Sequence, residues 1–143
     1  MQKRLELELL DETVAVLRLE PQADIPEWVY SSGFLSITRT GRELSIVCDQ
    51  SKLPGAAVPS DVEARLGLRC LAVRGPLSFT EIGILQAIAQ PLADASISIF
   101  VISTFDTDYL MVADLELDRA IAVLSEAGHR VFDVRGGSEK VAQ

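Results

Sequence analysis

The residue types that most often carry out catalysis or hold metals are scarce in this sequence. His129 is the single histidine, and it follows Gly128 without a serine or cysteine constellation near it. Cys48 and Cys70 lie inside apolar, strand-like runs with no second cluster of metal ligands beside them. A Walker-type glycine loop and a G-x-S-x-G elbow are also missing. We therefore predict no enzyme activity, no metal and no cofactor, and interpret His129 as a surface or helix-capping residue and the cysteines as reduced core residues.

The polar residues that could instead bind a ligand gather in one stretch, Gly75 to Asp114. Ser78 and Glu81 have the spacing of a capping box, which predicts that a helix begins at Ser78. Pro91 lies late in this helix and removes one hydrogen bond, so we expect a bend or an early end there.

A hairpin is predicted to follow this helix. The apolar run from Ile97 to Phe105 is typical of a central strand covered on both faces. Asp106 and Thr107 form the predicted tip, and residues 108–113 form the returning strand. Polar groups therefore gather at one end of the stretch, which favours ligand binding over catalysis.

Composition limits the partners of the chain. Of its 143 residues, 48% are hydrophobic and 24% charged, which is typical of a folded globular protein. The formal net charge of −8 would repel nucleic acid and anionic membranes. The N-terminus MQKRLELELL alternates charge with leucine, and no apolar run approaches the roughly 18 residues of a membrane span. We expect a cytoplasmic protein that contacts neither nucleic acid nor membrane.

The N-terminal half is predicted to be mostly strands. Residues 5–9 and 13–19 are strand-like and flank a turn, which predicts a hairpin. Residues 34–38 and 44–48 predict a second hairpin. A brief helix is expected to begin at Ser60 and end near Gly67.

The C-terminal part is predicted to be a helix followed by a strand. Asp114 is expected to cap the helix and Gly128 to end it. Residues 131–134 form the last predicted strand. One face of the helix should be buried, formed by Leu117, Ala120, Ile121 and Leu124.

An internal repeat indicates how these elements are organised. Residues 34–49 can be laid over residues 99–114 without a gap, which places strand, hairpin tip, strand and aspartate in the same order. The C-terminal order of strand, helix, strand, strand, helix, strand predicts an α+β, ferredoxin-like βαββαβ fold. We predict two tandem repeats, at residues 1–62 and 63–135, and a flexible tail at 136–143.

Three segments resemble the ACT-domain family. GPLSFTEIGILQAIAQPLADASISIFVISTFDTDYLMV and LDRAIAVLSEAGH resemble ACT domains of the branch shared by small bacterial ACT proteins and the CASTOR-type arginine sensors of animals. PEWVYSSGFLSITRTGRELSIVCD resembles the companion repeat of the bacterial proteins. Together these segments span most of the chain, and STFDTDYLMV is the most specific run.

The resemblance implies regulatory binding of a free amino acid or similar small molecule between ACT repeats, with no chemistry performed. It places the ligand between the helix start and the end of the hairpin. Since the animal sensors carry four repeats in one chain and this chain carries about two, the resemblance also implies a homodimer. The ligand-binding residues that it assigns are Glu81, Gly83 and Ile84 on one side and Thr104, Phe105 and Asp108 on the other.

The chemistry of these residues is consistent with that assignment. A helix start offers N–H groups to a carboxylate, and Gly83 permits close approach of a ligand to the backbone. Glu81 and Asp108 are suited to an ammonium group or a basic side chain. With Asp106 they place three acids near the site, so arginine and lysine are the first ligands to test.

Each of these residues also has a purely structural interpretation. Glu81 can serve only the capping box, Asp106 and Asp108 can be turn formers, and Phe105 can be a core residue. If these interpretations hold, the chain is a ligand-free protein–protein interaction or dimerisation module.

Overall fold

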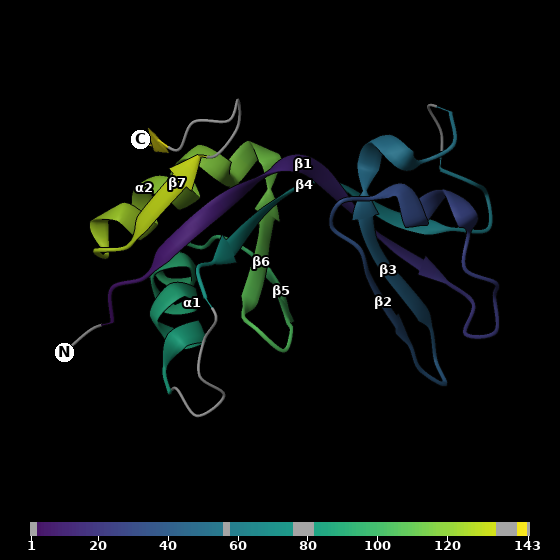
Figure 1. Cartoon of the computed structure of the whole chain (residues 1–143), viewed down its shortest axis with the longest axis horizontal. Helices are drawn as coiled ribbons and strands as arrows, with labels where there is room; N and C mark the ends of the chain where they lie inside the picture. Colours follow the sequence, from purple (N-terminus) through teal and green to yellow (C-terminus); the bar gives the residue numbers. More distant parts are fainter. Residues whose placement is uncertain (1–2, 56–57, 76–81, 134–139, 143) are drawn as a thin grey trace. The chain divides into compact units, whose positions relative to one another are not determined.

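The computed structural model describes residues 3–55, 58–75, 82–133 and 140–142. Its contacts group into two compact units: unit 1 comprises Met1–Asp11 and Arg69–Gln143, and unit 2 comprises Glu12–Leu68. Two long strands, β1 (Glu6–Leu19) and β4 (Glu63–Val73), contribute residues to both units (Figure 1). The first residues of the chain thus group with the C-terminal unit, while the boundaries of the two sequence repeats remain a prediction.

Unit 1 has the predicted ferredoxin-like order. After β4 come the helix α1, the strands β5 and β6, the short 3₁₀ helix η3, the helix α2 and the strand β7. The N-terminal part of β1 lies between β4 and β7 and runs parallel to β7. The bounds are α1 (Ile84–Asp94), β5 (Phe100–Ser103), β6 (Asp108–Ala113), η3 (Asp114–Glu116), α2 (Leu117–Glu126), β7 (Arg130–Asp133) and β8 (Lys140–Val141), which pairs with β7.

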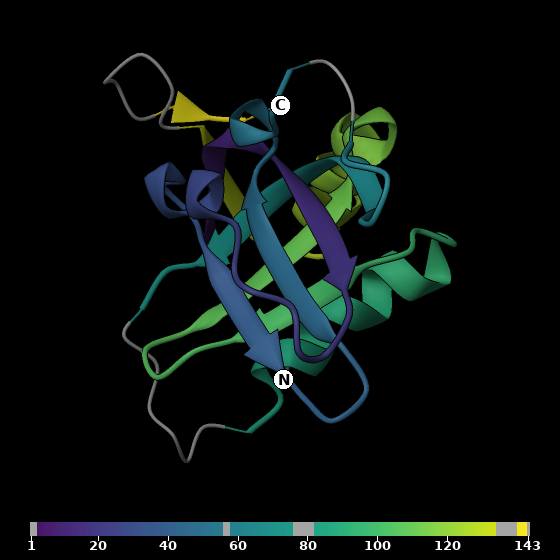
Figure 2. The same cartoon turned by 90° about the vertical axis from the view of Figure 1, so that its right-hand side faces the viewer.

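Both α1 and α2 pack on one face of the unit 1 sheet (Figures 1 and 2). Alternate residues of the strands point to this face, as the two-residue period of a strand requires. Each fully buried leucine or isoleucine there contributes about 1.5–3 kcal/mol relative to an exposed one. The predicted face of α2 is confirmed, because all four of its residues are buried. This core includes Leu7, Leu9, Leu71, Val73, Ile88, Leu92, Leu110, Val112, Ala120, Ile121 and Leu124.

Unit 2 is built on the predicted hairpin of β2 (Ser36–Arg39) and β3 (Leu44–Asp49). The C-terminal part of β1 pairs antiparallel with β3. Two short 3₁₀ helices, η1 (Glu27–Ser31) and η2 (Gln50–Lys52), and the N-terminal part of β4 complete the regular structure described there. A second hydrophobic core fills this unit, formed by Ala15, Leu17, Leu19, Val29, Leu44, Ile46 and Cys48.

Two predicted elements of the N-terminal half are wrong. Residues 6–19 form one continuous strand, not a hairpin, and the carboxylate of Glu12 accepts a hydrogen bond from the Phe34 N–H at 3.1 Å. Residues 63–67 belong to β4 and not to a helix. Gly67 has a φ of +71°, and its N–H donates to the Gln50 side chain at 2.6 Å. The glycine signal therefore marks an irregularity within a strand.

The apolar run from Ile97 also differs from the prediction. Its strand, β5, is only four residues long and pairs with β6 at one end of the strand order. Phe100 is 37% exposed, so β5 is not covered on both faces. Ile97 is buried before the strand begins. In α1, Pro91 is followed by three more helical residues, so the helix does not stop at the proline.

Candidate functional site

The turn between β5 and β6 is closed by hydrogen bonds of its own polar side chains. The Thr104 N–H donates to the Thr107 carbonyl at 2.8 Å, and the Thr104 hydroxyl donates to the same carbonyl at 3.1 Å. The Ser103 hydroxyl donates to Asp108 Oδ1 at 2.6 Å. Short hydroxyl and carboxylate side chains favour such local bonds. The turn therefore presents a fixed set of oxygen atoms at the end of the hairpin.

A further hydrogen bond joins this turn to the end of β4. The Thr107 hydroxyl donates to the Val73 carbonyl at 2.7 Å. Beside this bond lies a pocket of about 490 Å³, whose walls come from β1, β4, β6 and the hairpin turn. Its polar and charged lining residues are Glu8, Arg74, Asp106, Thr107 and Tyr109, and Gly75 adds backbone. Charges of both signs thus meet in one cavity of unit 1.

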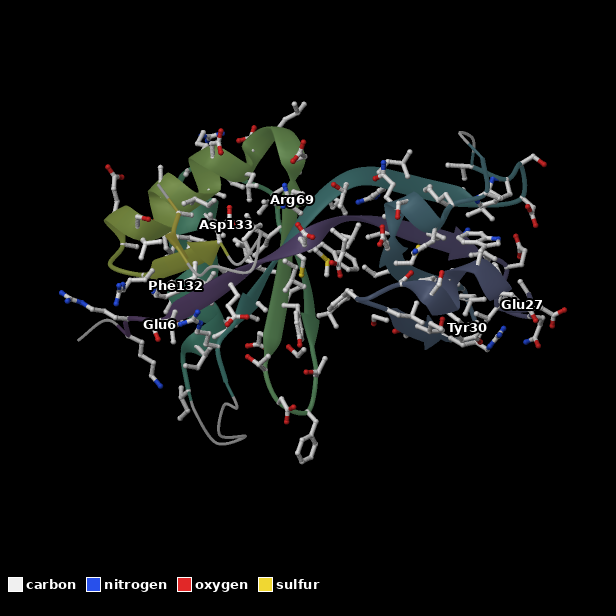
Figure 3. The ribbon with its side chains drawn as sticks, turned by 45° about the horizontal axis from the view of Figure 1, so that its top comes forward. Glu6, Glu27, Tyr30, Arg69, Phe132 and Asp133 are labelled. Atoms are coloured by element: carbon white, nitrogen blue, oxygen red, sulfur yellow. The ribbon has the colours of Figure 1, made fainter. Side chains whose placement is uncertain are left out.

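The guanidinium of Arg74 is held in place by several contacts. Its Nε donates to Glu8 Oε1 at 2.9 Å, and NH1 lies 3.8 Å from Glu6 Oε1. Its central carbon lies 3.9 Å from the centre of the Phe132 ring, within cation–π range. Figure 3 shows Glu6 and Phe132 on the neighbouring strands β1 and β7. Partly exposed ion pairs contribute little stability, but together these contacts fix the orientation of the guanidinium.

A second arginine of unit 1 is more deeply buried. Arg69, labelled in Figure 3, is 7% exposed; its NH2 donates to the Leu10 carbonyl at 3.2 Å, and its NH1 lies 3.6 Å from Asp114 Oδ1. Among the described residues, its Nε has no hydrogen-bond partner. These contacts tie β4 to β1 and to the segment that precedes α2.

The predicted start of the helix at Ser78 is wrong, because α1 begins at Ile84 and residues 82 and 83 before it are not helical. Ser78 and Glu81 lie outside the described residues. Gly83 is the residue before α1 and has a φ of +84°, a conformation that favours glycine. Ile84 is 7% exposed and belongs to the hydrophobic core, so its side chain packs inside unit 1.

Gly83 lines a second cavity, distinct from the one beside the hairpin. This cavity measures about 470 Å³ and is lined by α1, the N-terminal segment and the turn after α2. Its lining includes Lys3, Gln86, Asp94 and His129.

The predicted hairpin residues lie at the rim of unit 1. Thr104 is exposed, Phe105 is 84% exposed, and Asp108 is half-buried against Ser103. Asp106, which we interpreted as a turn former, lies in the turn and also lines the hairpin cavity. The structure therefore brings the hairpin next to the end of β4, whereas Gly83 lines the other cavity.

Several residues at these cavities were missed from the sequence. The alternation of Glu6 and Glu8 with leucines is typical of a strand with one buried face, but nothing local to β1 or β4 predicts their pairing with Arg74. His129 is 3% exposed, so its interpretation as a surface residue is wrong, whereas the alternative of a helix-capping residue agrees with the bond from its N–H to the Leu124 carbonyl. The glycine before it gave the only signal, that of a helix end.

Both cysteines are free and buried, as predicted. Burial, with a smaller effect of the Asp49 charge, raises the pKa of the Cys48 thiol from 9.0 to about 11. The described residues contain no group of three or more His, Cys, Asp or Glu side chains placed to hold a metal ion. No helix in the described part of the chain is long and apolar enough to cross a bilayer.

Comparison with known proteins places both parts of the chain among related sequences. A family model described as the ACT domain matches residues 63–126, and a second model, of an N-terminal domain, matches residues 12–56. The cytosolic arginine sensor for mTORC1 subunit 1 from Bos taurus is 36% identical over 98 residues, which are 66% of this chain and 30% of the relative. The chain thus spans about a third of the length of that curated relative.

Solved structures show the same architecture. A crystal structure of a protein from Agrobacterium tumefaciens has 38% sequence identity and a TM-score of 0.82, and the match covers 92% of this chain and 94% of that one. The regulatory subunit of aspartate kinase from Thermus flavus has a TM-score of 0.61 at 12% identity, over 87% of this chain and 99% of that one. At 12% identity, the similarity to the aspartate kinase subunit shows a shared fold and nothing more.

Proposed function

Since the chain belongs to the ACT-domain family, we propose that it is a non-catalytic regulatory protein that binds a free amino acid at an interface between ACT repeats. The relative from Bos taurus is named an arginine sensor, which supports an amino acid as the ligand class. We place the protein in the cytoplasm, with neither nucleic acid nor membrane as a partner.

The cavity beside the hairpin is the observation that carries this proposal. A free amino acid has a carboxylate and an ammonium group a few ångströms apart, and the cavity offers Arg74 together with Glu8 and Asp106. Charge-assisted hydrogen bonds from such groups are about twice as strong as neutral ones. The turn is held against β4 by the bond from Thr107 to Val73, so little ordering is required when a ligand binds.

The six residues assigned by resemblance complete the proposed site. Asp108, oriented by Ser103, receives the ligand ammonium or a basic side chain. Phe105 covers the ligand from the hairpin, where it is 84% exposed in the single chain. Gly83 offers backbone atoms from the helix start; Ile84 follows it directly, and Glu81 lies two residues before it in the sequence.

A homodimer supplies the second repeat of the proposed interface. The helix start of one copy faces the hairpin end of the other, which explains why Gly83 and the hairpin turn line different cavities in one chain. The excess of acidic residues at the hairpin favours a basic ligand, so arginine and lysine come first.

Thermal denaturation against the twenty amino acids tests the function. A ligand present at one hundred times its dissociation constant adds about 2.7 kcal/mol to the free energy of unfolding, so its melting curve should move visibly. We expect arginine or lysine to raise the melting temperature, with the corresponding D-amino acid as a control for charge alone. If none of the twenty moves the curve, the sensor proposal is wrong.

The alternative is a ligand-free interaction or dimerisation module. The exposed side chains of Phe100 and Phe105 and the position of β5 at the end of the strand order favour it. In that case the protein would self-associate without responding to any amino acid, which the same melting experiment distinguishes when it is combined with sedimentation.

A further inference from the structure

His129 occupies an unusual position in unit 1. It lies in the turn between α2 and β7, and its N–H donates to the Leu124 carbonyl at 3.0 Å, which holds it on the last turn of α2. Its side chain is buried, yet it lines the cavity at the start of α1. Both ring nitrogens lie within hydrogen-bond distance of backbone atoms from two other elements.

The first of these backbone atoms is a carbonyl that α1 leaves unsatisfied. In a helix the carbonyl of Ala87 would accept the N–H of residue 91, but residue 91 is proline and has no N–H. His129 Nε2 lies 2.9 Å from this Ala87 oxygen. Because a carbonyl only accepts hydrogen bonds, Nε2 must carry a proton and donate it. His129 thus replaces the hydrogen bond that Pro91 removes.

The second backbone atom fixes the state of the other ring nitrogen. The N–H of Leu5, just before β1, lies 3.1 Å from His129 Nδ1. Since an N–H only donates, Nδ1 must be unprotonated and accept this bond. Together the two bonds require the neutral imidazole with its proton on Nε2. The Leu5 carbonyl in turn accepts the Arg130 N–H at 2.9 Å, so the N–H and the carbonyl of Leu5 are bonded to residues 129 and 130, respectively.

We propose that His129 is a pH-sensitive clasp that joins the start of β1, α1 and the turn after α2, and that a proton on Nδ1 opens it. The added N–H would point at the N–H of Leu5, so the bond between them must break. The bond to Ala87 is unaffected by this proton. Acid therefore releases the start of β1 selectively.

Charged groups of both signs lie around the ring. Lys3 from the N-terminal segment and Asp94 from α1 line the same cavity, and Gln90 already donates to Asp94 at 2.8 Å. Arg4 lies against Gly128, with its Nε 3.5 Å from where a β-carbon would stand. Arg130 of β7 is paired with Glu6 of β1 at 3.7 Å, and the turn after α2 contributes the uncharged Ala127 to the cavity lining.

Hydrogen exchange of the Leu5 amide tests the clasp directly. After correction for the intrinsic exchange rate, we expect its protection to fall about tenfold or more between pH 7.5 and 5.5, as loss of one buried hydrogen bond implies. The matched control is His129→Gln, whose side-chain amide has a donor and an acceptor but does not titrate, so its Leu5 protection should stay constant. Equal pH dependence in the parent and this variant would overturn the proposal.

Nitrogen NMR of the parent protein gives a second test that needs no variant. Because the chain contains a single histidine, its ring signals need no assignment. At pH 7.5 they should show the neutral form protonated at Nε2, and the form protonated at Nδ1 would overturn the proposal.

A double-mutant cycle adds a readout specific to Pro91. Pro91→Ala restores an N–H for the Ala87 carbonyl, so His129→Phe should lower the melting temperature less in that background than in the parent. Equal losses of melting temperature in the two backgrounds would show that His129 does not stabilise the carbonyl that Pro91 leaves without a donor. That result would contradict the clasp.

Discussion

Asp106 and Asp108 lie two residues apart on one hairpin but have different surroundings, which allows a matched test of the binding site. Asp108 accepts a hydrogen bond from Ser103, and Asp106 lines the cavity with Arg74. We expect Asp108→Asn to weaken binding of a basic amino acid about tenfold or more, because a hydrogen bond to a charged group contributes about 1.5–3 kcal/mol. Titration calorimetry measures this loss.

Asp106→Asn is the comparison for that measurement. It removes the same charge from the same hairpin, so any general electrostatic effect appears in both variants. We expect a smaller loss of affinity for this variant. A larger loss with Asp106→Asn than with Asp108→Asn would show that Asp106 receives the basic group of the ligand and would contradict the role given to Asp108.

The thiol of Cys48 gives a pH prediction at the level of one residue. Because burial raises its pKa from 9.0 to about 11 in the folded chain, the unfolded thiol loses its proton first as the pH rises. The contribution to stability is therefore fully present below pH 9 and is lost as the pH rises towards 11, by up to about 3 kcal/mol. Urea unfolding of the parent and of Cys48→Ala at pH 8 and pH 10.5 measures this; an unchanged difference between the two proteins would contradict it.

The start of α1 gives a prediction at the level of an element. Gly83 has a φ of +84°, and a β-carbon added there would meet no other atom within 4 Å, so Gly83→Ala should cost only backbone strain, about 1–2 kcal/mol. Gly41, in the turn between β2 and β3, has equal space and no positive φ. Gly41→Ala should therefore be nearly neutral. Equal melting temperatures for the two variants would show that alanine fits at position 83 without backbone strain and would contradict this prediction.

Periodic patterns predicted the elements of unit 1 well. The four buried residues of α2 repeat with helical spacing, and the order βαββαβ follows from strand and helix patterns alone. The long strand β1 was missed because Asp11 and Glu12 have the composition of a turn. Only the tertiary fold shows that Glu12 accepts the N–H of Phe34.

The candidate site was predictable only where it is local in sequence. The hairpin turn, with its threonines and aspartates, lies in one short run that the sequence identifies. The opposite wall of the cavity depends on a contact between Arg74 and Glu8, which are 66 residues apart. The Ala87 carbonyl receives no N–H from Pro91 and instead accepts a hydrogen bond from His129, which is 42 residues away in the sequence. Sequence patterns do not predict such pairings.

At the scale of the whole molecule we predict a homodimer. Among the described residues of unit 1, β5 pairs only with β6, so one of its edges is open to another strand. The exposed Phe100 on this strand favours burial against a second copy. Sedimentation equilibrium at micromolar concentration should give twice the mass of 15.5 kDa. A monomer at high micromolar concentration would exclude the dimer.

The central claim is that a free amino acid binds at the end of the β5–β6 hairpin. An NMR titration of the ¹⁵N-labelled protein with L-arginine and L-lysine tests this claim most directly, because it reports affinity and location together. We predict saturable shifts of the amides of Thr104, Phe105 and Asp108, accompanied by Gly83 at the helix start. Absence of saturable shifts with either ligand and with the neutral amino acids, or shifts confined to unit 2, would contradict the account.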